Sequence, residues 1–152
     1  MYKQMQKVII FFLIFLNMME YSYSKDEYFM TLRNDKVNLR QGPSFEYPVK
    51  LFYEKKFLPV LIQDSSDNFK KVRDHENNTG WIHRSQLSKK KAAIVIGVDL
   101  IMSSSPTIYS NPVAIVKEGR LLKINKCKDS WCKVSSGDYK GWIKNINLWG
   151  LF

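Results

Sequence analysis

Gly80-Trp81-Ile82 returns in the second half of the chain as Gly141-Trp142-Ile143, and the residues before each copy repeat as well. The echoes keep one order, at offsets that drift only from 63 to 61 residues. They pair residues 60–62 with 122–124, residues 69–72 with 131–134 and, more faintly, residues 42–44 with 105–107. Ordered echoes at a nearly constant spacing indicate one small folding unit used twice in tandem.

Short strand-like runs fill both units. Beyond residue 24, no window of eleven or more residues sustains the i, i+3, i+4 apolar spacing of an amphipathic helix. Polar turn clusters separate the runs instead. The predicted strands are 28–32, 49–53, 58–62, 69–72 and 80–83 in the first unit, and 93–98, 113–116, 121–127, 131–134 and 141–143 in the second. Many short strands with almost no helix predict an all-β chain of small barrels.

Alternation along these strands assigns the residues that point inward. The predicted inward set is Val60, Ile62, Val72 and Ile82 in the first unit and Leu122, Ile124, Val134 and Ile143 in the second. Trp81 and Trp142 precede an inward Ile, so alternation puts them on the opposite face. There they cap the barrel end or form the contact between the units, and ligand contact is the less favoured interpretation.

The first 24 residues are predicted to be a secretory signal peptide. Lys3 and Lys7 give a positive start, residues 8–16 are an unbroken apolar run, and Ser22 and Ser24 suit a cleavage site. The alternative is a retained membrane anchor, which needs roughly 20 apolar residues. We therefore predict an exported protein, periplasmic or extracellular after cleavage, with membrane contact only through an uncleaved signal segment.

The repeat divides the rest of the chain into two predicted domains, 25–88 and 89–152. Each is about 60 residues long, near the lower limit for an independent hydrophobic core. We therefore expect mutual packing or a covalent link to support them. Only residues 88–91 join the two units, and so short a connection predicts that they lie close together.

Cys127 and Cys132 flank a four-residue polar turn between two strand-like runs, so their side chains are expected to meet across a hairpin. In an exported protein such a pair is typical of a disulfide. A metal site or a redox pair is disfavoured, because the spacing is not Cys-x-x-Cys and both histidines lie in the other unit. The first unit has Ser65 and Lys70 at the equivalent positions, so the disulfide is predicted for the second unit alone.

The chain is strongly basic. Without residues 1–24 it carries 22 lysines and arginines against 13 aspartates and glutamates, a formal net charge of +9. Such a surface attracts polyanions, namely nucleic acid, anionic lipid or acidic wall polymers. Export argues against nucleic acid. Scattered lysines with one cluster at 89–91 are also typical of solvated strand faces and a linker, so the charge alone names no partner.

The repeated motifs of the two units resemble those of the tandem bacterial SH3-like domains of exported proteins. The resemblance covers nearly all of the chain after residue 24. In the first unit the resemblance rests on residues 37–44, Val-Asn-Leu-Arg-Gln-Gly-Pro-Ser, and on residues 80–88, Gly-Trp-Ile-His-Arg-Ser-Gln-Leu-Ser. In the second it rests on residues 131–134, 141–143 and 148–150. The resemblance implies small, strongly bent β-barrels and a binding or targeting role, often toward cell-wall material, and family members are seldom enzymes.

The two units depart from the family pattern in different places. Residues 102–105 of the second unit read Met-Ser-Ser-Ser where residues 39–42 of the first read Leu-Arg-Gln-Gly. Phe57 of the first unit stands where the family tends to have Gly, which the second unit retains as Gly119.

Five side chains are candidates for ligand contact. Phe69 and Trp131 are out of phase with the inward residues of their strands, which predicts that they are half-exposed. Tyr47 and Tyr109 lie in the equivalent loops of the two units and are placed to join them. Arg40 either anchors an acidic group or is a solvated strand charge.

No catalytic constellation can be assembled from the sequence. His75 lies with Asp74 in a predicted solvated loop, and His83 has no Ser or Cys nucleophile at a supporting spacing. We therefore predict a protein that is not an enzyme and has no cofactor or metal. The predicted function is a non-catalytic exported binding or scaffolding module of the bacterial cell envelope that contacts a cell-wall peptide or glycan, or an envelope protein. The alternative is an electrostatic binder of nucleic acid or anionic lipid.

Overall fold

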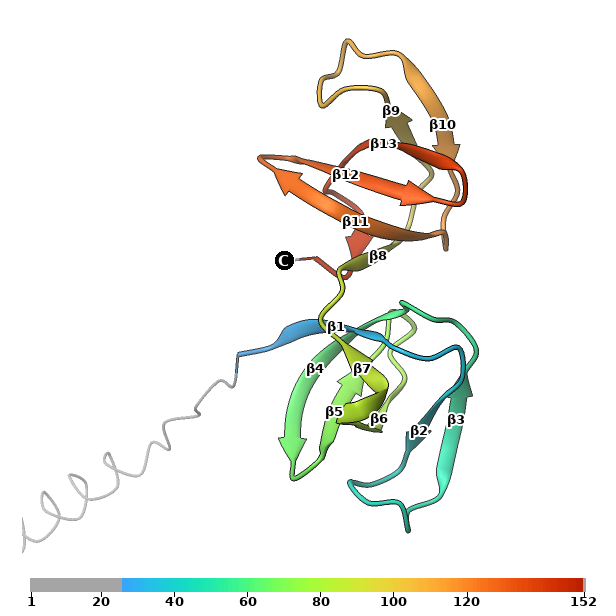
Figure 1. The fold of residues 1–152 in the computed structure, drawn as a ribbon, viewed down its shortest axis with the longest axis vertical. Helices are drawn as coiled ribbons and strands as arrows, with labels where there is room; N and C mark the ends of the chain where they lie inside the picture. The colour runs from blue at the N-terminus through green and yellow to red at the C-terminus, as the bar shows by residue number, and fades with distance from the viewer. Residues whose placement is uncertain (1–25, 152) are drawn as a thin grey trace, which may run out of the picture.

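The computed structural model describes residues 26–151, which form two seven-stranded antiparallel sheets, each bent into a barrel (Figure 1). Barrel 1 contains β1 (Tyr28–Leu32), β2 (Val37–Arg40), β3 (Val49–Tyr53), β4 (Pro59–Ser66), β5 (Phe69–Arg73), β6 (Thr79–His83) and β7 (Leu87–Ser88). Barrel 2 contains β8 (Ala92–Val95), β9 (Leu100–Ser103), β10 (Pro112–Val116), β11 (Leu121–Lys128), β12 (Trp131–Ser136), β13 (Tyr139–Lys144) and β14 (Leu148–Trp149). The predicted signal peptide, residues 1–24, lies outside the described residues.

The two barrels share one topology. Their strand orders, β3-β2-β6-β5-β4-β1-β7 and β10-β9-β13-β12-β11-β8-β14, correspond strand for strand. The register corresponds too, since Phe69 pairs with His83 in barrel 1 and Trp131 with Lys144 in barrel 2. The predicted all-β fold of two tandem barrels is therefore confirmed. In residues 26–151 the only helix is a three-residue 3₁₀ turn, η1 (Arg84–Gln86), and no helix there has the length and hydropathy to span a bilayer.

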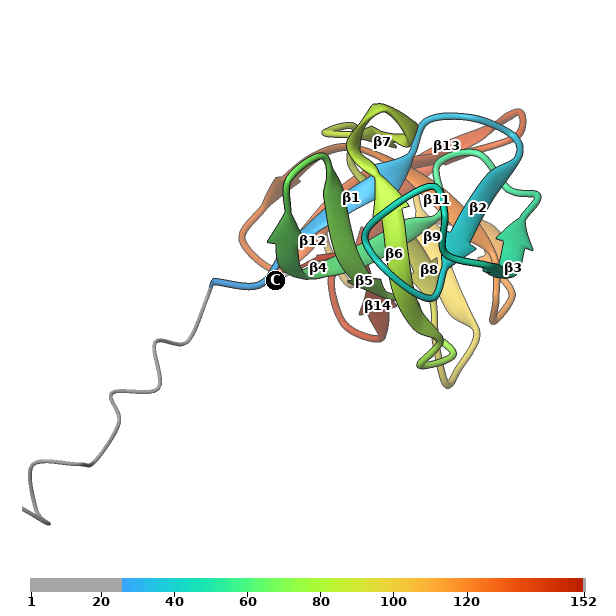
Figure 2. The same cartoon turned by 90° about the horizontal axis from the view of Figure 1, so that it is seen from below.

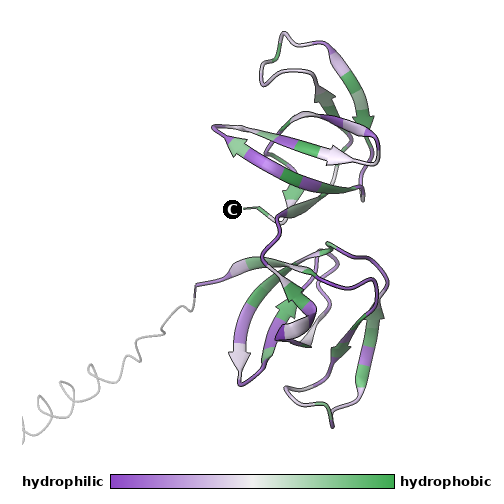
Figure 3. Cartoon of the chain, viewed as in Figure 1, coloured by the Kyte–Doolittle hydropathy of each residue, from purple (hydrophilic) through white to green (hydrophobic). Residues whose placement is uncertain are grey.

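Each barrel fills its own hydrophobic core with alternate residues of its strands, which appear as the apolar segments in Figure 3. Seven of the eight predicted inward residues are at most 2% exposed: Val60, Ile62, Val72, Ile82, Leu122, Val134 and Ile143. The eighth, Ile124, is half-buried and packs at the margin of the barrel 2 core, next to a shift of register in β11. Trp81 and Trp142 are both half-buried, on the face opposite the neighbouring Ile, as alternation predicted.

The glycine of each Gly-Trp-Ile segment is required by a close approach between strands. A Cβ atom on Gly80 would lie 2.7 Å from the carbonyl oxygen of Arg40, and one on Gly141 would lie 2.7 Å from that of Ser103. Both distances are shorter than real Cβ contacts allow, and both neighbours are backbone atoms that cannot move aside. The two glycines therefore let β6 and β13 pass against β2 and β9 and close each barrel.

Phe57 adopts a backbone conformation that usually belongs to glycine. Its φ angle is 67°, and Gly119 at the equivalent position of barrel 2 has a φ of 76°. A left-handed conformation costs a bulky residue of order 1 kcal/mol or more. The Phe57 ring lies 4.9 Å from the ammonium group of Lys123 and 5.5 Å from that of Lys90, so the aromatic side chain gains cation contacts at the junction of the barrels.

Cys127 and Cys132 form a disulfide, as predicted. They pair directly across the hairpin between β11 and β12, with their Cα atoms 4.0 Å apart. Ser65 and Lys70 occupy the same paired positions in barrel 1. The disulfide therefore belongs to barrel 2 alone.

The two barrels pack against each other through the last strand of the chain. The Trp149 ring meets the Phe29 ring edge-on at 5.2 Å between centroids, and the Arg73 guanidinium lies 5.3 Å from the Trp149 ring. Leu61 pairs in register with both Phe29 and Arg73, so it lies between the two residues that Trp149 contacts. It is only 2% exposed. The side of barrel 1 that alternation assigns to solvent is thus covered by barrel 2.

The first strand of barrel 2 strengthens this contact. Ile94 belongs to the buried cluster of barrel 1, and Ile96 and Leu121 pack against that cluster. In Figures 1 and 2 the barrels stack along the long axis of the molecule, joined by a hydrophilic linker that is visible in Figure 3. The expectation that the units lie close together is confirmed.

Candidate functional site

A groove in barrel 2 gathers the largest group of exposed apolar side chains around a sequence-predicted residue. It runs between β9, the loop before β10, the start of β12 and the residues after β13, with a volume of about 430 Å³. Its lining includes Ile101, Ile108, Pro112, Trp131, Lys144 and Ile146. Trp131 is half-buried, as predicted, so one part of its ring surface is available in the groove.

Three isoleucines give the groove its apolar character. Ile101 is 61% exposed, Ile108 is 67% exposed and Ile146 is 54% exposed. Single exposed apolar residues are ordinary, but a contiguous group around a tryptophan marks a surface suited to a partner. The sequence analysis missed all three, although Ile108 is the one large aliphatic residue in an otherwise polar loop.

Charged groups of both signs border the groove. Lys144 and Asp99 are both among the residues that line it. Lys117 donates to the Asp99 carboxylate at 2.7 Å and the backbone N–H of Glu118 donates at 3.0 Å. These two hydrogen bonds, the one from Lys117 first, hold the pKa of Asp99 below its ordinary value. The groove therefore combines an apolar strip with one cation and one carboxylate in its lining.

In barrel 1 the side chain of Phe45, itself 65% exposed, lies over the equivalent surface. Phe45, which corresponds to Ile108, lies with its ring centroid 5.1 Å from Phe69 and 5.1 Å from His83. Phe69 corresponds to Trp131 but is only 5% exposed. The prediction that Phe69 is half-exposed is wrong, because strand alternation takes no account of a loop residue that folds over the strand.

Arg40 holds that loop in place. Its Nη1 donates to the carbonyl oxygen of Tyr47 at 2.8 Å and to that of Phe45 at 3.1 Å, and its guanidinium lies 5.4 Å from the Phe45 ring. Arg40 is half-buried and ties the loop through Nη1, so it is more than a solvated strand charge, and its contact with a ligand stays a prediction. Ser103 takes its place in barrel 2, where a Ser104–Ser110 hydroxyl pair at 2.8 Å ties the loop instead.

The remaining predicted residues lie outside the groove lining. Tyr47 packs over Gly42, where an added Cβ would lie 2.5 Å from the ring, and keeps 47% of its surface exposed. Tyr109 is 90% exposed at the tip of the barrel 2 loop. Trp142 lies against Lys126, with the ammonium 5.6 Å from the ring. The tryptophan that contacts the other barrel is Trp149.

Asp74 is a buried structural group that the sequence analysis placed in a solvated loop. It is 1% exposed and its carboxylate accepts hydrogen bonds from the Tyr53 hydroxyl at 3.0 Å, the Asn78 side chain at 2.9 Å and the backbone N–H groups of Glu76 and Asn78. Burial and the Asp74 carboxylate raise the pKa of Tyr53 well above its ordinary value. The prediction was wrong because Asp74 closes the end of the barrel.

Residues 26–151 contain no group of three His, Cys, Asp or Glu side chains that is suited to a metal ion.

The chain matches the family described as "Bacterial SH3 domain" over residues 33–89 and again over residues 100–150. No curated protein matches the chain.

Two solved structures are similar at 17% identity: NlpC2 and NlpC1 from Trichomonas vaginalis, each with a TM-score of 0.37. The similarity covers 84% of this chain, but 49% of NlpC2 and 47% of NlpC1. The matched region therefore spans about half the length of either structure.

Proposed function

Because the chain belongs to the bacterial SH3 domain family, we propose that it is a non-catalytic binding module of the bacterial envelope that holds cell-wall material in the groove of barrel 2. The observation that carries the proposal is the groove itself, in which Trp131 is flanked by three exposed isoleucines. Barrel 1 covers the equivalent surface with Phe45. An exposed apolar groove lowers the solubility of a protein. Binding of a ligand there explains why the groove is exposed.

The ligand class that fits this groove is a cell-wall peptide. An extended peptide with small apolar side chains matches the strip of Trp131 and the isoleucines, and its amines and carboxylates match Asp99 and Lys144 at the borders. The disulfide in barrel 2 supports export, because disulfides persist in oxidising compartments. The net charge of +9 after residue 24 favours approach to an acidic wall.

Retention on purified peptidoglycan at moderate salt tests the proposal. Trp131→Ala is expected to weaken retention at least tenfold, because a central aromatic residue dominates a small interface. Phe52→Ala is the matched control, since that aromatic side chain is also exposed, at 52%, but lies in barrel 1 and does not line the groove. Far-UV circular dichroism and melting show that both variants fold. Absence of wild-type retention, or equal retention of Trp131→Ala, contradicts the proposal.

A second candidate function rests on a different surface, a hollow of about 630 Å³ at the junction of the barrels. Four lysines line it, Lys70, Lys89, Lys90 and Lys91, together with apolar atoms of Phe29 and Met30 and no acidic residue. This arrangement suits an anionic lipid or another polyanion. Binding there would fall steeply with salt, because each neutralised anionic group releases counterions. A flat salt dependence of retention excludes this candidate.

A further inference from the structure

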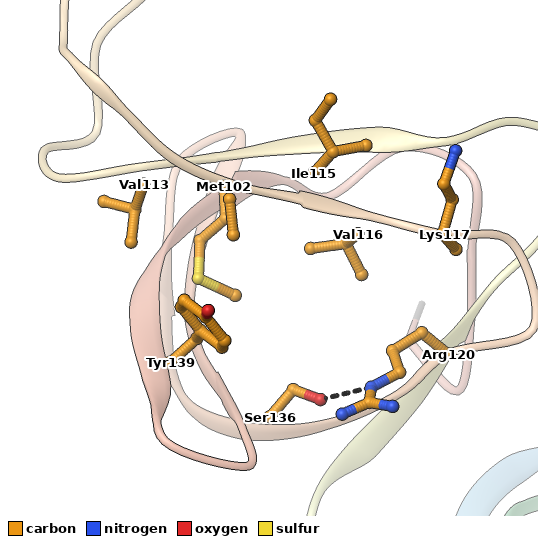
Figure 4. Close-up of a pocket in the computed structure, with 9 residues that line it drawn as sticks. Met102, Val113, Ile115, Val116, Lys117, Arg120, Ser136 and Tyr139 are labelled. Atoms are coloured by element: carbon orange, nitrogen blue, oxygen red, sulfur yellow. Dashed lines mark hydrogen bonds between the residues drawn. The ribbon is translucent and has the colours of Figure 1, made fainter.

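The end of barrel 2 contains a second pocket, separate from the Trp131 groove and from the function proposed for it. Its volume is about 430 Å³, and it lies between β10, β11 and the turn that joins β12 to β13 (Figure 4). Met102 and Val116 form its buried apolar floor, at 1% and 5% exposed. Tyr139 stands at one side, and Arg120 and Ser136 lie opposite the floor (Figure 4).

Arg120 is exposed, and its guanidinium is tied to the rim of the pocket on its Nε side. Its Nε donates to the Ser136 hydroxyl at 2.7 Å, and that hydroxyl donates in turn to the carbonyl oxygen of Leu121 at 3.3 Å. These two hydrogen bonds occupy the Nε side of the guanidinium. They leave its two Nη groups without a partner among residues 26–151. A tethered guanidinium with one free edge is prepared for a planar, two-oxygen acceptor.

No charge within the pocket neutralises Arg120. The residues that line the pocket include no aspartate or glutamate. Lys117 also borders it, but its ammonium is bound to Asp99 at 2.7 Å and projects, like Ile115, from the other side of the strand (Figure 4). An anion in the pocket therefore meets one guanidinium edge and apolar walls, with no further donors for the third oxygen of a phosphate or sulfate.

Barrel 1 has no such pocket because the equivalent residues fill it. Tyr53 corresponds to Val116, Asp74 to Ser136 and Leu58 to Arg120. The Tyr53 hydroxyl donates to the Asp74 carboxylate at 3.0 Å, and Leu58 is buried in the core. The open pocket and its arginine are properties of barrel 2 alone.

From this geometry we propose that the pocket binds the C-terminal residue of a peptide. The terminal carboxylate pairs with the two Nη groups of Arg120, and a small apolar side chain packs on Met102 and Val116 beside the Tyr139 ring. A carboxylate next to a small apolar group uses both halves of the pocket, whereas a bare anion uses only the arginine. The volume is at the small end of the range for ligand sites and accommodates one or two small residues.

Nuclear magnetic resonance titration of the ¹⁵N-labelled protein tests this assignment, with acetyl-Ala-Ala as the probe. The free acid is expected to shift the amide signals of Arg120, Leu121, Ser136 and Tyr139. Its C-terminal amide and plain acetate are each expected to bind at least tenfold more weakly, because each lacks one half of the recognition. Arg120→Gln, an exposed site whose change leaves the core intact, is expected to remove the shifts, and Arg120→Lys to weaken binding by a smaller factor.

Trp131→Ala separates the two sites, because it is expected to leave this titration unchanged while it weakens wall retention. The assignment is overturned if the amide binds as tightly as the acid, if acetate or inorganic phosphate binds equally well, or if Arg120→Gln titrates like the wild type. It is also overturned if the shifts map to the Trp131 groove, or if 20 mM acetyl-Ala-Ala shifts no signal in the pocket. Apart from shifts that map to the Trp131 groove, which would support peptide binding there, these results leave retention through Trp131 untouched.

Discussion

The two barrels have the same scaffold but treat their surfaces in opposite ways. Barrel 1 closes its groove with Phe45 and its end with the Tyr53–Asp74 hydrogen bond. Barrel 2 leaves both places open and lines them with Trp131 and Arg120. The residues that are repeated in both copies, such as the close-approach glycines, therefore maintain the barrel. The residues that differ between the copies determine which surface is free for a partner.

A third difference concerns the contact between the barrels. Leu61 and Lys123 occupy equivalent positions, yet Leu61 is buried and Lys123 is exposed. Barrel 2 covers the outer face of β4 through Trp149, while nothing in residues 26–151 covers the same face of β11 to that extent. Barrel 1 therefore has a filled core and an outer face that barrel 2 covers. Barrel 2 has the exposed groove and the end pocket.

The largest expected effect comes from replacing Leu61 of barrel 1 by lysine, the residue that barrel 2 has at the equivalent position. Leu61→Lys is expected to lower the free energy of unfolding by about 3 kcal/mol or more, because a charge enters a covered site next to Arg73. The reverse change, Lys123→Leu, is expected to cost less than about 1 kcal/mol, since it removes only an exposed cation contact with Phe57. Urea unfolding measures both. Equal costs would contradict the asymmetry of the two outer faces.

The barrel ends give the next largest effect. Asp74→Ala is expected to destabilise the protein by about 3 kcal/mol, because it leaves the buried Tyr53 hydroxyl and two part-buried backbone N–H groups without this acceptor. Ser136→Ala, at the equivalent position of barrel 2, is expected to cost about 1 kcal/mol or less, since Arg120 remains in contact with water. A cost for Asp74→Ala no greater than that for Ser136→Ala would show that the network does not close barrel 1.

The scaffold could be predicted from the sequence because repetition and alternation are local signals. Offsets of 63 to 61 residues aligned the two units, and alternation identified Val60, Val72 and Ile82 correctly as core residues. The disulfide followed from a short spacing across a turn. These features depend on residues that are neighbours in the chain or in a hairpin.

Two errors, Phe69 and Asp74, arose where a distant segment buries a residue that the local pattern left exposed. Phe69 is buried by Phe45, and Asp74 is buried at a barrel end that Tyr53 completes, 21 residues away. The burial of Leu61 by barrel 2 was not predicted, although the exchange of Leu61 for Lys123 between the repeats is a sign of that contact in the sequence. The groove and the end pocket were missed because an empty space depends on what its neighbours leave unfilled.

Alkaline pH gives a smaller effect that is specific to barrel 1. The raised pKa of Tyr53 favours its neutral form in the folded protein, so its contribution is complete below the ordinary tyrosine pKa of 10.0 and is lost as pH rises above that value. One group contributes about 1 kcal/mol of lost stability between pH 10 and pH 11. Urea unfolding at the two pH values, for the wild type and for Tyr53→Phe, measures it as the difference between their losses. Identical losses would mean that Tyr53 ionises freely in the folded barrel.

The smallest change in stability, but the most direct test of the proposed function, comes from exchanging the groove residues. Phe45→Ile is expected to cost about 1 kcal/mol, the value of an aromatic contact with Phe69, and to uncover the barrel 1 groove. Ile108→Phe is expected to leave stability within about 0.5 kcal/mol, because that side chain is exposed, and to lower peptidoglycan retention as the new ring covers Trp131. Ile115→Phe, equally exposed but outside the groove, is the matched control. If Ile108→Phe and Ile115→Phe are retained alike, the open groove is not where barrel 2 binds, and its difference from barrel 1 is one of packing alone.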